Sequence, residues 1–519
     1  MRVIIRADAS GMIGGGHMMR CLSLAQSLRA KGDTAAFVMA ATGTDWTGMV
    51  TRAGFAVYPV APRVRGHDDD GPWHQRWLSA PWQDDAKVTA QAVRDFAADW
   101  LIWDHYGLDA RWVHVVRQAA GRLRVMAIDD LDDRALGSDL VLDQTRLDST
   151  ARTHPAPAPL SGPAYATLRP EFAALRAQAL ARRAKARDGR HVLVTLGLAD
   201  AAGLAPDIVA TLAQVPGVSA DIVMGASAQT LPRVRALCAE HSRFALHVDT
   251  QDMAGLMLRA DLCIGAGGMT SWERCCLGLA TLLVPVAENQ TDVARALAQA
   301  GAVQVLEVAQ ARNPRELQAA LHVALAQAPV MGQVAAGLCD GLGTQRVVDV
   351  LGGELRAVTP ADARLLFDWR NQPHIRAASL NTAALDWQGH LDWIAGLQGR
   401  TDGVFWVYTE GGRDLGHVNA RRGDDGIWRW GFYIGADDAP KGAGRRMLAL
   451  ALVQLFSRPD CAEIEAEVRA DNPRSVALHR ALSFRQMASR DDGRVLVFSL
   501  NECDIDSVFS IQFPKDPRP

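Results

Sequence analysis

Short apolar runs alternate with longer segments of helical periodicity over roughly the first 150 residues. Apolar runs bounded by polar or glycine positions fit buried strands, and the stretches between them are long enough to hold a crossover helix. Repeated alternation of this kind is typical of βαβ units and a mainly parallel sheet. The pattern predicts a first Rossmann-like domain over residues 1–152, with strands at Val3–Ala7, Ala35–Met39, Trp100–Asp104, Arg124–Asp129 and Leu140–Asp143.

A stretch rich in Pro and Ala, Thr153–Pro163, predicts a linker to a second alternation of the same kind. This alternation predicts a second doubly wound domain over residues 164–350. Two such domains form a cleft between the carboxyl ends of their strands, where open α/β sheets bind ligands. The clearest predicted strands of the second domain are His191–Leu196, Asp221–Met224, Leu262–Gly265 and Thr281–Val286.

The sequence pattern changes after Gly352, where aromatic-rich alternation appears in Phe405–Tyr408 and Trp428–Ile434. Such alternation favours antiparallel strands. We therefore expect an α+β domain over residues 354–500, followed by a tail over residues 501–519 that shows no strong period. The predicted fold class is α/β, with two Rossmann-like domains followed by this third domain.

Composition narrows the classes of function. The chain has 55 basic and 58 acidic residues and a formal charge of −3, so it lacks the basic field that holds a nucleic acid. The eight cysteines form no CxxC pair, which predicts reduced thiols and no zinc or other metal site. No uninterrupted run of about twenty apolar residues occurs, and the chain begins directly with a strand pattern. These features predict a cytoplasmic enzyme without a membrane partner, and they assign no oligomeric state.

A glycine turn follows the first predicted strand and leads into a helix. It consists of Gly14, Gly15 and Gly16, and His17 follows on the first helical turn. Glycines let backbone N–H groups approach a phosphate or a sugar, although such turns also serve tight packing. The helix dipole at His17 favours a neutral imidazole, which can accept a proton from water. The alternative is that His17 is only a polar residue at the start of a helix.

A second glycine turn follows the strand Leu262–Gly265. It offers the backbone N–H groups of Gly267 and Gly268 and the hydroxyls of Thr270 and Ser271 to a diphosphate. Glu273, about one helical turn further on, can accept hydrogen bonds from a ribose diol, or it is a solvated helix carboxylate.

The third domain contains a loop that suits coenzyme A. The strand Trp430–Gly435 is followed by a glycine-containing turn that opens a helix and offers N–H groups to a pyrophosphate, although it can also be an ordinary turn. A further strand, Glu463–Arg469, leads to Asn472 and to a helix that ends near Phe484. The turn residues are Lys441, Gly442, Ala443, Gly444 and Arg445.

Over roughly residues 1–350 the chain resembles the UDP-sugar hydrolases of pseudaminic acid biosynthesis, which have the GT-B fold. The resemblance is carried by Ile4–Asp8, Gly14–Cys21, Gly267–Glu273 and Glu288–Gln290. It implies that water replaces UDP on UDP-2,4-diacetamido-2,4,6-trideoxy-β-L-altropyranose, with His17 as the base and with no metal. The segment Thr195–Asp200 departs from the family's glycine pair. The residues that we expect to bind this substrate are Asp8, Gly15, Gly16, Arg20, Asp104, Tyr106, Gly267, Gly268, Thr270, Ser271, Glu273, Glu288, Asn289 and Gln290.

Three residues that end the strand Trp100–Asp104 have two interpretations. Asp104, His105 and Tyr106 can contact the sugar or orient His17, or they only position the loop that contains them.

Residues 354–500 resemble the GCN5-related N-acetyltransferases, which implies acetyl-CoA as co-substrate held by the turn residues Lys441–Arg445 and by Asn472. Lys441 and Arg446 depart from the usual loop, and Ser483 replaces the common Gly before Phe484. His479 stands where the family has the Tyr that protonates the departing thiolate. His479 is therefore either a catalytic acid or a structural residue.

Part of the third domain resembles the acetyltransferase of the same pathway. The resemblance is carried by Asp368–Asn371, which includes Arg370 and Asn371, and by His390 and Trp393. It implies that these residues shape a sugar-nucleotide site. The alternative is amphipathic packing. The implied reaction acetylates the 4-amino group of UDP-4-amino-4,6-dideoxy-N-acetyl-β-L-altrosamine.

The two implied reactions are consecutive, because the acetylated product of one is the substrate of the other. The sequence therefore predicts a bifunctional enzyme whose partners are UDP-sugars and acetyl-CoA. One alternative is a GT-B glycosyltransferase joined to an acetyltransferase that modifies a polysaccharide or lipid acceptor. A second alternative is that the third domain is a nonenzymatic CoA-binding module.

Overall fold

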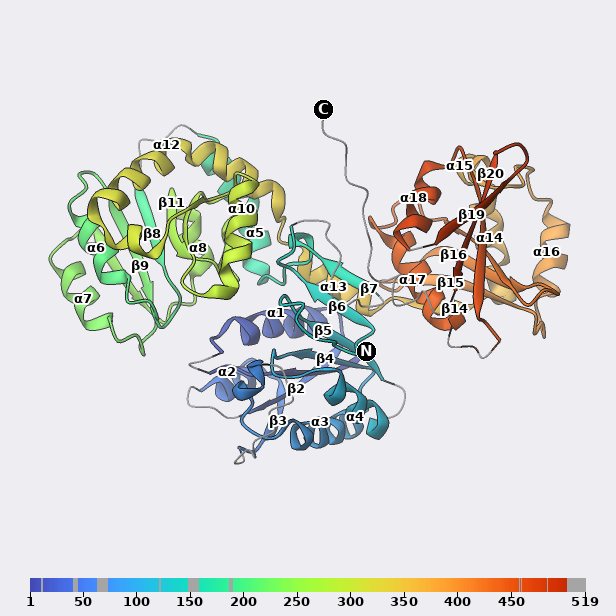
Figure 1. Ribbon diagram of the computed structural model, residues 1–519, viewed down its shortest axis with the longest axis horizontal. Coiled ribbons are helices and arrows are strands. Elements are labelled where there is room, and N and C mark those ends of the chain that lie inside the picture. The colour runs from blue at the N-terminus through green and yellow to red at the C-terminus, as the bar shows by residue number, and fades with distance from the viewer. Residues whose placement is uncertain are drawn as a thin grey trace. The chain divides into compact units, whose positions relative to one another are not determined.

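The computed structural model describes residues 1–10, 13–40, 45–62, 73–120, 123–147, 158–185, 190–456, 458, 460–482 and 484–501. Their strands form three sheets, two in the portion before residue 347 and one after it (Figure 1). The predicted residues 153–157, Ser483, the tail after Asn501 and the side chain of Asn289 lie outside this description.

The first sheet has seven strands in the order β3-β2-β1-β4-β5-β6-β7. β1 pairs in parallel with β2 on one side and with β4 on the other, so the strand order reverses between β1 and β4. The elements are β1 (Arg2–Ala7), α1 (Gly16–Ala30), β2 (Thr34–Ala40), α2 (Trp46–Arg52), β3 (Ala56–Val60), η1 (Trp73–Trp77), α3 (Trp82–Phe96), β4 (Trp100–Asp104), α4 (Ala110–Ala120), β5 (Arg124–Ile128), β6 (Leu140–Asp143) and β7 (Ala158–Ser161).

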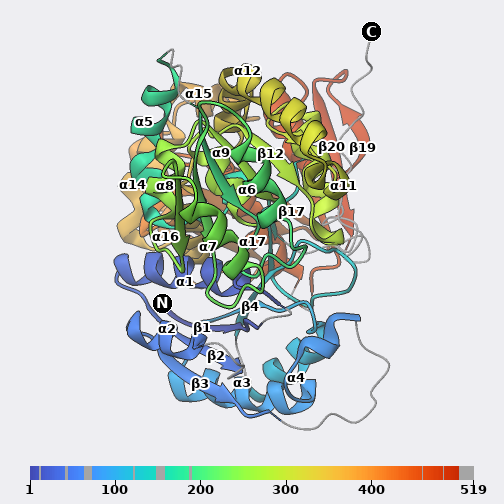
Figure 2. The ribbon, with the colours of Figure 1, turned by 90° about the vertical axis from the view of Figure 1, so that its left-hand side faces the viewer.

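Helices cover both faces of this sheet. Figure 1 and Figure 2 show α1 on one face and α3 with α4 on the opposite face. Strands buried on both faces need apolar residues at most positions, which explains why β1 and β4 are largely apolar, with the buried charges of Arg6 and Asp104 as exceptions. Their carboxyl ends lie where the strand order reverses, and α/β sheets bind ligands at such a point.

The second sheet repeats this plan with six strands in the order β10-β9-β8-β11-β12-β13, so its order reverses between β8 and β11. One face packs under α6, α7, α11 and α12, and the other under α5, α8, α9 and α10. The elements are η2 (Pro163–Tyr165), α5 (Pro170–Arg183), β8 (His191–Thr195), α6 (Ala205–Ala213), β9 (Ser219–Met224), α7 (Leu231–Ala239), β10 (Phe244–Val248), α8 (Met253–Arg259), β11 (Leu262–Ala266), α9 (Thr270–Cys276), β12 (Thr281–Val284), η3 (Glu288–Gln290), α10 (Thr291–Gln299), β13 (Gln304–Val305), α11 (Val308–Arg312) and α12 (Pro314–Leu338).

Helix α12 is the longest apolar helix of this portion. The stretch Pro314–Leu351, which contains it, is long and apolar enough to cross a membrane by length and composition alone. Its residues Leu317, Leu321 and Ala335 are buried in the cores of the second sheet. A core helix of a globular domain has the same properties.

The third sheet has seven strands in the order β14-β15-β16-β17-β18-β20-β19. Helices α17 and α18 pack on one face and α14 with α16 on the other. The elements are α13 (Gly343–Leu351), β14 (Glu354–Ala357), η4 (Pro360–Asp362), α14 (Ala363–Arg370), α15 (Pro373–Ala378), α16 (Trp387–Ala395), β15 (Gly403–Glu410), β16 (Arg413–Arg422), β17 (Trp428–Ile434), α17 (Ala443–Phe456), β18 (Glu463–Arg469), α18 (Pro473–Ala481), β19 (Arg485–Arg490) and β20 (Val495–Asn501).

Two central strands of the third sheet separate along their length. All strand pairs with a described register are antiparallel except β17 and β18, which run in parallel and pair only at Trp428 with Ile464 and at Arg429 with Glu465. The rest of β17 and β18 makes no ladder with each other. Backbone groups of both strands are therefore available between them.

The predicted fold class is confirmed: two parallel Rossmann-like sheets precede a mainly antiparallel sheet that carries helices on both faces. The predicted linker over Thr153–Pro163 contains regular structure in its second half. Ala158–Ser161 forms edge strand β7, and Pro163 opens the turn η2. Proline is tolerated at these places because edge strands and first helical positions do not need its N–H group.

Candidate active sites

His17 and Asp104 form a hydrogen-bonded pair at the reversal point of the first sheet. His17 lies on the first turn of α1, after β1, and Asp104 is the last residue of β4. The distance from His17 Nδ1 to Asp104 Oδ1 is 2.5 Å. An ionised carboxylate only accepts hydrogen bonds, so Nδ1 carries the hydrogen and the lone pair of the neutral ring is on Nε2. Nε2 is the nitrogen that can take a proton from water.

Arg20, one turn further along α1, binds the same carboxylate. Its Nε and Nη2 lie 2.5 and 2.6 Å from the two oxygens of Asp104. Asp104 is fully buried, which alone would raise the pKa of its carboxyl group. The charges and hydrogen bonds of Arg20 and His17 outweigh burial and hold the pKa of Asp104 well below its ordinary value. Asp104 is thus a permanent anion behind the imidazole.

Aromatic side chains surround this pair. The Tyr106 ring meets the His17 ring edge to face at 4.7 Å, and the rings of His74 and Trp77 adjoin Tyr106. The Tyr106 hydroxyl donates to Asp130, and burial raises the pKa of Tyr106 well above its ordinary value. Tyr106 is therefore an uncharged wall beside His17.

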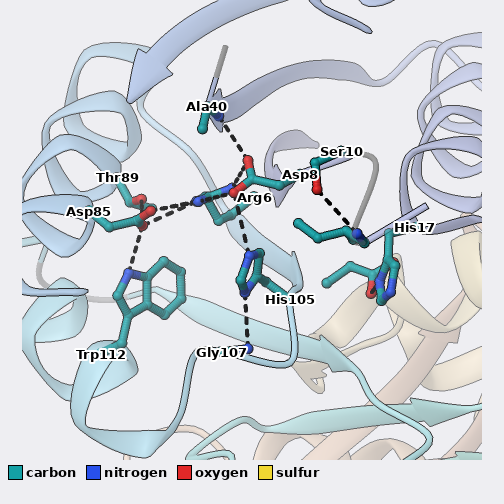
Figure 3. A network of polar contacts seen from close by, with 12 residues as sticks. Arg6, Asp8, Ser10, His17, Ala40, Asp85, Thr89, His105, Gly107 and Trp112 are labelled. Atoms are coloured by element: carbon teal, nitrogen blue, oxygen red, sulfur yellow. Dashed lines mark hydrogen bonds and ion pairs between the residues drawn. The ribbon is translucent and has the colours of Figure 1, made fainter. Parts of the chain in front are cut away.

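A second buried network lies behind the site and includes Asp8, as Figure 3 shows. Arg6 lies between two carboxylates, with Nη1 2.5 Å from Asp8 and Nη2 2.6 Å from Asp85. Asp8 also accepts the backbone N–H of Ala40. We predicted substrate contacts for Asp8, but the structure places its carboxylate 2% exposed, with both oxygens engaged by protein donors.

His105 belongs to the network of Asp8 and not to that of His17. Its Nε2 lies 3.5 Å from Asp8, and its Nδ1 accepts the backbone N–H of Gly107. Burial lowers the pKa of His105 to about 3, so the ring is neutral at physiological pH. Of the three residues predicted at this strand end, Asp104 and Tyr106 contact His17.

The first glycine turn is closely packed at one position and open at the next. A Cβ atom on Gly15 would lie 2.5 Å from the Trp46 ring, whereas one on Gly16 would meet only Met269, at 3.6 Å. Gly14 has a φ of +77°, which favours glycine. Gly14 and Gly15 therefore have structural reasons to be glycine, and Gly16 does not.

The second glycine turn, after β11, is held by Gln290. The side-chain oxygen of Gln290 accepts the N–H groups of Gly267 and Val286, and the N–H of Ser271 donates to the carbonyl of Gly268. The N–H groups of Gly267 and Ser271 are therefore already used in hydrogen bonds within the protein. Gly268 is exposed and Thr270 is half-buried. Of the predicted diphosphate contacts, these two lie nearest to solvent.

Glu273 and Glu288 have different surroundings. Glu273 Oε1 lies 3.5 Å from Arg169, and burial raises the pKa of Glu273 despite that charge. Glu288 is exposed at the start of η3. After β8, Asp200 accepts backbone N–H groups at the start of α6 and the hydroxyl of Thr230, so the divergent segment Thr195–Asp200 ends in a helix cap.

In the third sheet the predicted CoA turn is tied to strand β15. Gly442 has a φ of +86°, and Lys441 is exposed. Arg446, one turn into α17, binds both oxygens of Glu410 at 2.9 and 2.6 Å and donates to the carbonyl of Lys441 at 3.1 Å. Glu410 also accepts the hydroxyl of Tyr408. Arg446, which departs from the usual loop of the family, therefore links the turn to strand β15.

His479 does not have the surroundings of a catalytic acid. The ring is 1% exposed, its Nδ1 donates to the carbonyl of Ser475 at 2.8 Å, and its Nε2 accepts from Trp430 at 3.2 Å. Burial lowers the pKa of His479 to about 4, so it holds no proton for a thiolate at neutral pH. Of the two predicted roles for His479, this geometry favours the structural one.

Asn472 caps helix α18, because its side chain accepts the N–H of Ser475. Arg370 and Asn371 bind the loop between α15 and α16. Arg370 donates to the carbonyl of Asn381, and the Asn371 amide pairs with the backbone of Leu385. These residues shape the loop that they hold.

His390 and Trp393 belong to the packing of α16. His390 Nε2 donates to the carbonyl of Ala363 at 2.8 Å, and burial lowers the pKa of His390. The rings of His390 and Trp393 stack at 5.4 Å, and Trp393 also meets Phe405. The amphipathic-packing alternative accounts for both contacts.

A cavity of about 730 Å³ at the carboxyl end of β18 was not predicted from the sequence. Its lining includes Arg469, Asp471, the β19–β20 turn and Leu380. This volume lies in the range of small-molecule sites. Leu380 belongs to the loop that Arg370 and Asn371 hold, so these two predicted residues support a wall of the cavity.

Within the described ranges, no group of three or more His, Cys, Asp or Glu side chains is placed to hold a metal ion. Sequence reasoning also missed Arg274, a buried arginine beneath the second glycine turn, and the pair Arg446–Glu410. A lone basic residue among the apolar residues of α9 was the available signal for Arg274.

Comparison with known proteins separates the chain into the same portions. Residues 238–334 match the family described as "Glycosyltransferase family 28 C-terminal domain", and residues 354–485 match "Acetyltransferase (GNAT) domain". MurG of Acinetobacter baumannii superposes with a TM-score of 0.50 at 20% identity, over 67% of this chain and 99% of that structure. This likeness shows the fold alone, which is of the GT-B type.

Two curated relatives are similar over long stretches. The spore coat polysaccharide biosynthesis protein SpsG of Bacillus subtilis is 24% identical over 360 residues, 68% of this chain and 98% of the relative. An uncharacterized protein of Methanocaldococcus jannaschii is 20% identical over 508 residues, 94% of this chain and 97% of the relative. The chain thus joins a glycosyltransferase-like portion to an acetyltransferase domain of the GNAT type.

Proposed function

We propose that the chain is a bifunctional cytoplasmic enzyme of pseudaminic acid biosynthesis. Its third domain acetylates the 4-amino group of UDP-4-amino-4,6-dideoxy-N-acetyl-β-L-altrosamine, and its first two domains hydrolyse the product to UDP and 2,4-diacetamido-2,4,6-trideoxy-β-L-altropyranose. The observation that carries the proposal is the pairing of His17 with the buried Asp104 at the reversal point of the first sheet.

Hydrolysis needs a base and a stabilised leaving group. His17 Nε2 takes a proton from water as the water oxygen bonds to the anomeric carbon, and the bond from that carbon to the UDP oxygen breaks with its electron pair on UDP. Asp104 keeps the reactive tautomer and stabilises the imidazolium that forms. The turn Gly267–Ser271 receives the diphosphate, with Gly268 and Thr270 at the surface of that turn. A general base contributes about 10²- to 10⁴-fold, so leaving-group stabilisation must be large as well.

Acetyl transfer uses the separated strands of the third sheet. The neutral amine attacks the thioester carbonyl of acetyl-CoA, the carbon–sulfur bond breaks, and the amine loses a proton to water or a backbone carbonyl. The turn Lys441–Arg445 holds the pyrophosphate, and backbone groups between β17 and β18 hold the pantetheine. The cavity beside β18 takes the amino sugar nucleotide. Because His479 is neutral and engaged, the thiolate takes its proton from solvent.

The test follows both reactions in one tube. The protein is incubated with acetyl-CoA and the 4-amino UDP-sugar, and free CoA, UDP and sugar are followed by mass spectrometry and NMR. We expect CoA release first and UDP release afterwards without any added alcohol. His17→Ala should stop UDP release while CoA release continues. Unchanged UDP release in that variant would exclude His17 as the base.

A second candidate function is favoured by the printed name of SpsG, a spore coat polysaccharide biosynthesis protein, and by the GT-B fold. In this case the first two domains transfer the sugar to a polysaccharide or lipid acceptor, and the third domain acetylates that sugar. UDP would then leave only when an acceptor alcohol is added, which the same assay distinguishes.

A further inference from the structure

A buried guanidinium lies beneath the second glycine turn. Arg274, in helix α9, is 1% exposed. Its Nη2 donates to the carbonyl of Ala266 at 2.7 Å and to Ser271 Oγ at 2.9 Å, and its Nη1 lies 3.4 Å from Thr270 Oγ1. These contacts join the residue before the turn to the two hydroxyl residues after it.

The guanidinium of Arg274 makes no direct ion pair in the described part of the chain, and its charge acts on the Glu273 carboxylate only through space. Within the described ranges, no carboxylate lies within 4.0 Å of its guanidinium, and Nε makes no hydrogen bond. The neighbouring Glu273 carboxylate lies 3.5 Å from Arg169 instead. Buried charges are normally paired, because removing an ion from water costs several kcal/mol. The turn therefore has positive charge beneath it that a bound anion would balance.

The strand β11 makes room for this side chain. A Cβ atom on Gly265 would lie 2.2 Å from Arg274 Nη1, so only glycine at position 265 leaves the guanidinium in its place. Gly265 has no positive φ and no turn of its own to explain it. The position of the Arg274 guanidinium therefore depends on a residue of strand β11 as well as on helix α9.

Arg274 also sets the orientation of the hydroxyl groups of Thr270 and Ser271. A guanidinium has only donors, so the oxygens of Thr270 and Ser271 must accept from it, and each hydroxyl keeps its own hydrogen to donate elsewhere. Ser271 is buried, whereas Thr270 is half-buried beside the exposed Gly268. The hydrogen of the Thr270 hydroxyl is therefore available on the open side of the turn, where it suits an anionic oxygen.

We propose that Arg274 is a positioning residue for the diphosphate of the nucleotide sugar. It orients the Thr270 hydroxyl as a donor and places a fixed positive charge beneath the phosphate oxygens. This inference rests on the proposed function, because it takes a nucleoside diphosphate as the ligand of the turn. Arg274 touches no substrate, and it stabilises the charge of departing UDP through the turn.

The experiment compares ligands that differ only in phosphate. Dissociation constants of UDP, UMP and uridine are measured by calorimetry for the wild-type protein and for Arg274→Met, Arg274→Lys and Thr270→Val. We expect Arg274→Met to weaken UDP binding by about tenfold to a hundredfold, as for a lost hydrogen bond to a charged group. The affinity for uridine should hardly change. Arg274→Lys should recover part of the UDP affinity, because it keeps the charge.

A matched control is Arg176→Met. Arg176 is partly buried, less so than Arg274, and donates to the carbonyls of Cys276, Cys339 and Ala336 and to no residue of the turn. It should lose stability without changing the ratio of UDP to uridine affinity. If Arg274→Met does not fold, Thr270→Val tests the same inference, because it leaves the guanidinium in place and should lose UDP affinity.

The outcomes separate the inference from the proposed function. A wild-type protein that binds no UDP would overturn both. UDP binding by the wild type, with the same ratio of UDP to uridine affinity in Arg274→Met or in a folded Thr270→Val, would overturn the inference alone. A decrease of that ratio in both variants but not in Arg176→Met supports it.

Discussion

Replacing Asp104 by Asn tests the structural basis of the proposed hydrolysis. The change keeps the size of the side chain but exchanges one accepting oxygen for an NH₂ donor. Asp104 accepts from His17 at 2.5 Å and from Arg20 at 2.5 and 2.6 Å, so both of its oxygens are needed. With the NH₂ group toward His17, Nδ1 becomes an acceptor and Nε2 carries the hydrogen. The ring then has no lone pair for water.

Two magnitudes follow from this geometry. In the Ser-His-Asp triad the same exchange lowers kcat about 10⁴-fold through the wrong tautomer, and a general base is worth about 10²- to 10⁴-fold, so we expect a loss in that range. Arg20, which is 4% exposed, also loses its carboxylate. Breaking a buried pair costs about 3–5 kcal/mol, and Asp130 at 3.6 Å from Arg20 favours the lower end.

The assay measures kcat for UDP release together with the free energy of unfolding. Asp85→Asn is the matched control. Asp85, in α3, is as buried as Asp104 and pairs with Arg6 of β1, but it does not touch His17. We expect it to lose stability and keep kcat. Asp104→Asn with kcat within about threefold of the wild type would refute the reasoning, and so would an equal loss of kcat in Asp85→Asn.

Three further predictions concern other buried groups. His479→Phe should keep kcat for acetyl transfer within severalfold, because both ring nitrogens already have protein partners, and a loss of 10²-fold or more in CoA release would restore His479 as an acid. Arg446→Ala should raise KM for acetyl-CoA and lower the melting temperature, since it frees the carbonyl of Lys441 and leaves Glu410 buried without its cation; an unchanged KM would separate the turn from cofactor binding. His105 has a folded pKa of about 3 against about 6.5 when unfolded, so the unfolded chain takes up its proton first as pH falls, and stability should decrease by about 1.4 kcal/mol per pH unit below about 6. Hydrogen exchange of the β1 and β4 amides between about pH 6 and about pH 4, corrected for the intrinsic pH dependence of exchange, measures this slope, which should flatten in His105→Gln.

Local pattern predicted the strands that are buried on both faces, because such strands contain short runs of consecutive apolar residues. β1 and β4 are such strands, and the predicted runs Val3–Ala7 and Trp100–Asp104 lie within them. β16, at Arg413–Arg422, carries arginines at both ends and glycine and histidine within, so no apolar run marks it. Its place in the sheet follows from pairing with β15 and β17, which local composition does not encode.

The candidate site was most predictable where one segment holds the chemistry, although the expected contact of Asp104 with His17 joins two distant segments. His17 and its glycine turn are adjacent in the chain, and the structure keeps them together. The state of His479 depends on Trp430, which is 49 positions away, and on burial by neighbouring rings. Asp8 was expected to bind substrate from the family resemblance of Ile4–Asp8, but Arg6 and the backbone N–H of Ala40 engage its carboxylate. Partners distant in sequence decide whether a polar side chain at a strand end faces a ligand or a buried partner.

The two Rossmann-like sheets use their reversal points in complementary ways. In the first, a buried anion, Asp104, stands behind an imidazole that must become positive as it takes a proton. In the second, a buried cation, Arg274, lies beneath the turn that we propose receives the diphosphate, which becomes more negative as UDP departs. Each fixed charge has the sign opposite to the charge that develops in front of it, and neither has to be reorganised from solvent. Such preorganised charges lower the barrier more than exposed charges of the same sign, because buried groups are screened little. The burial that makes Asp104 and Arg274 costly to the fold therefore also makes them effective in the proposed reaction.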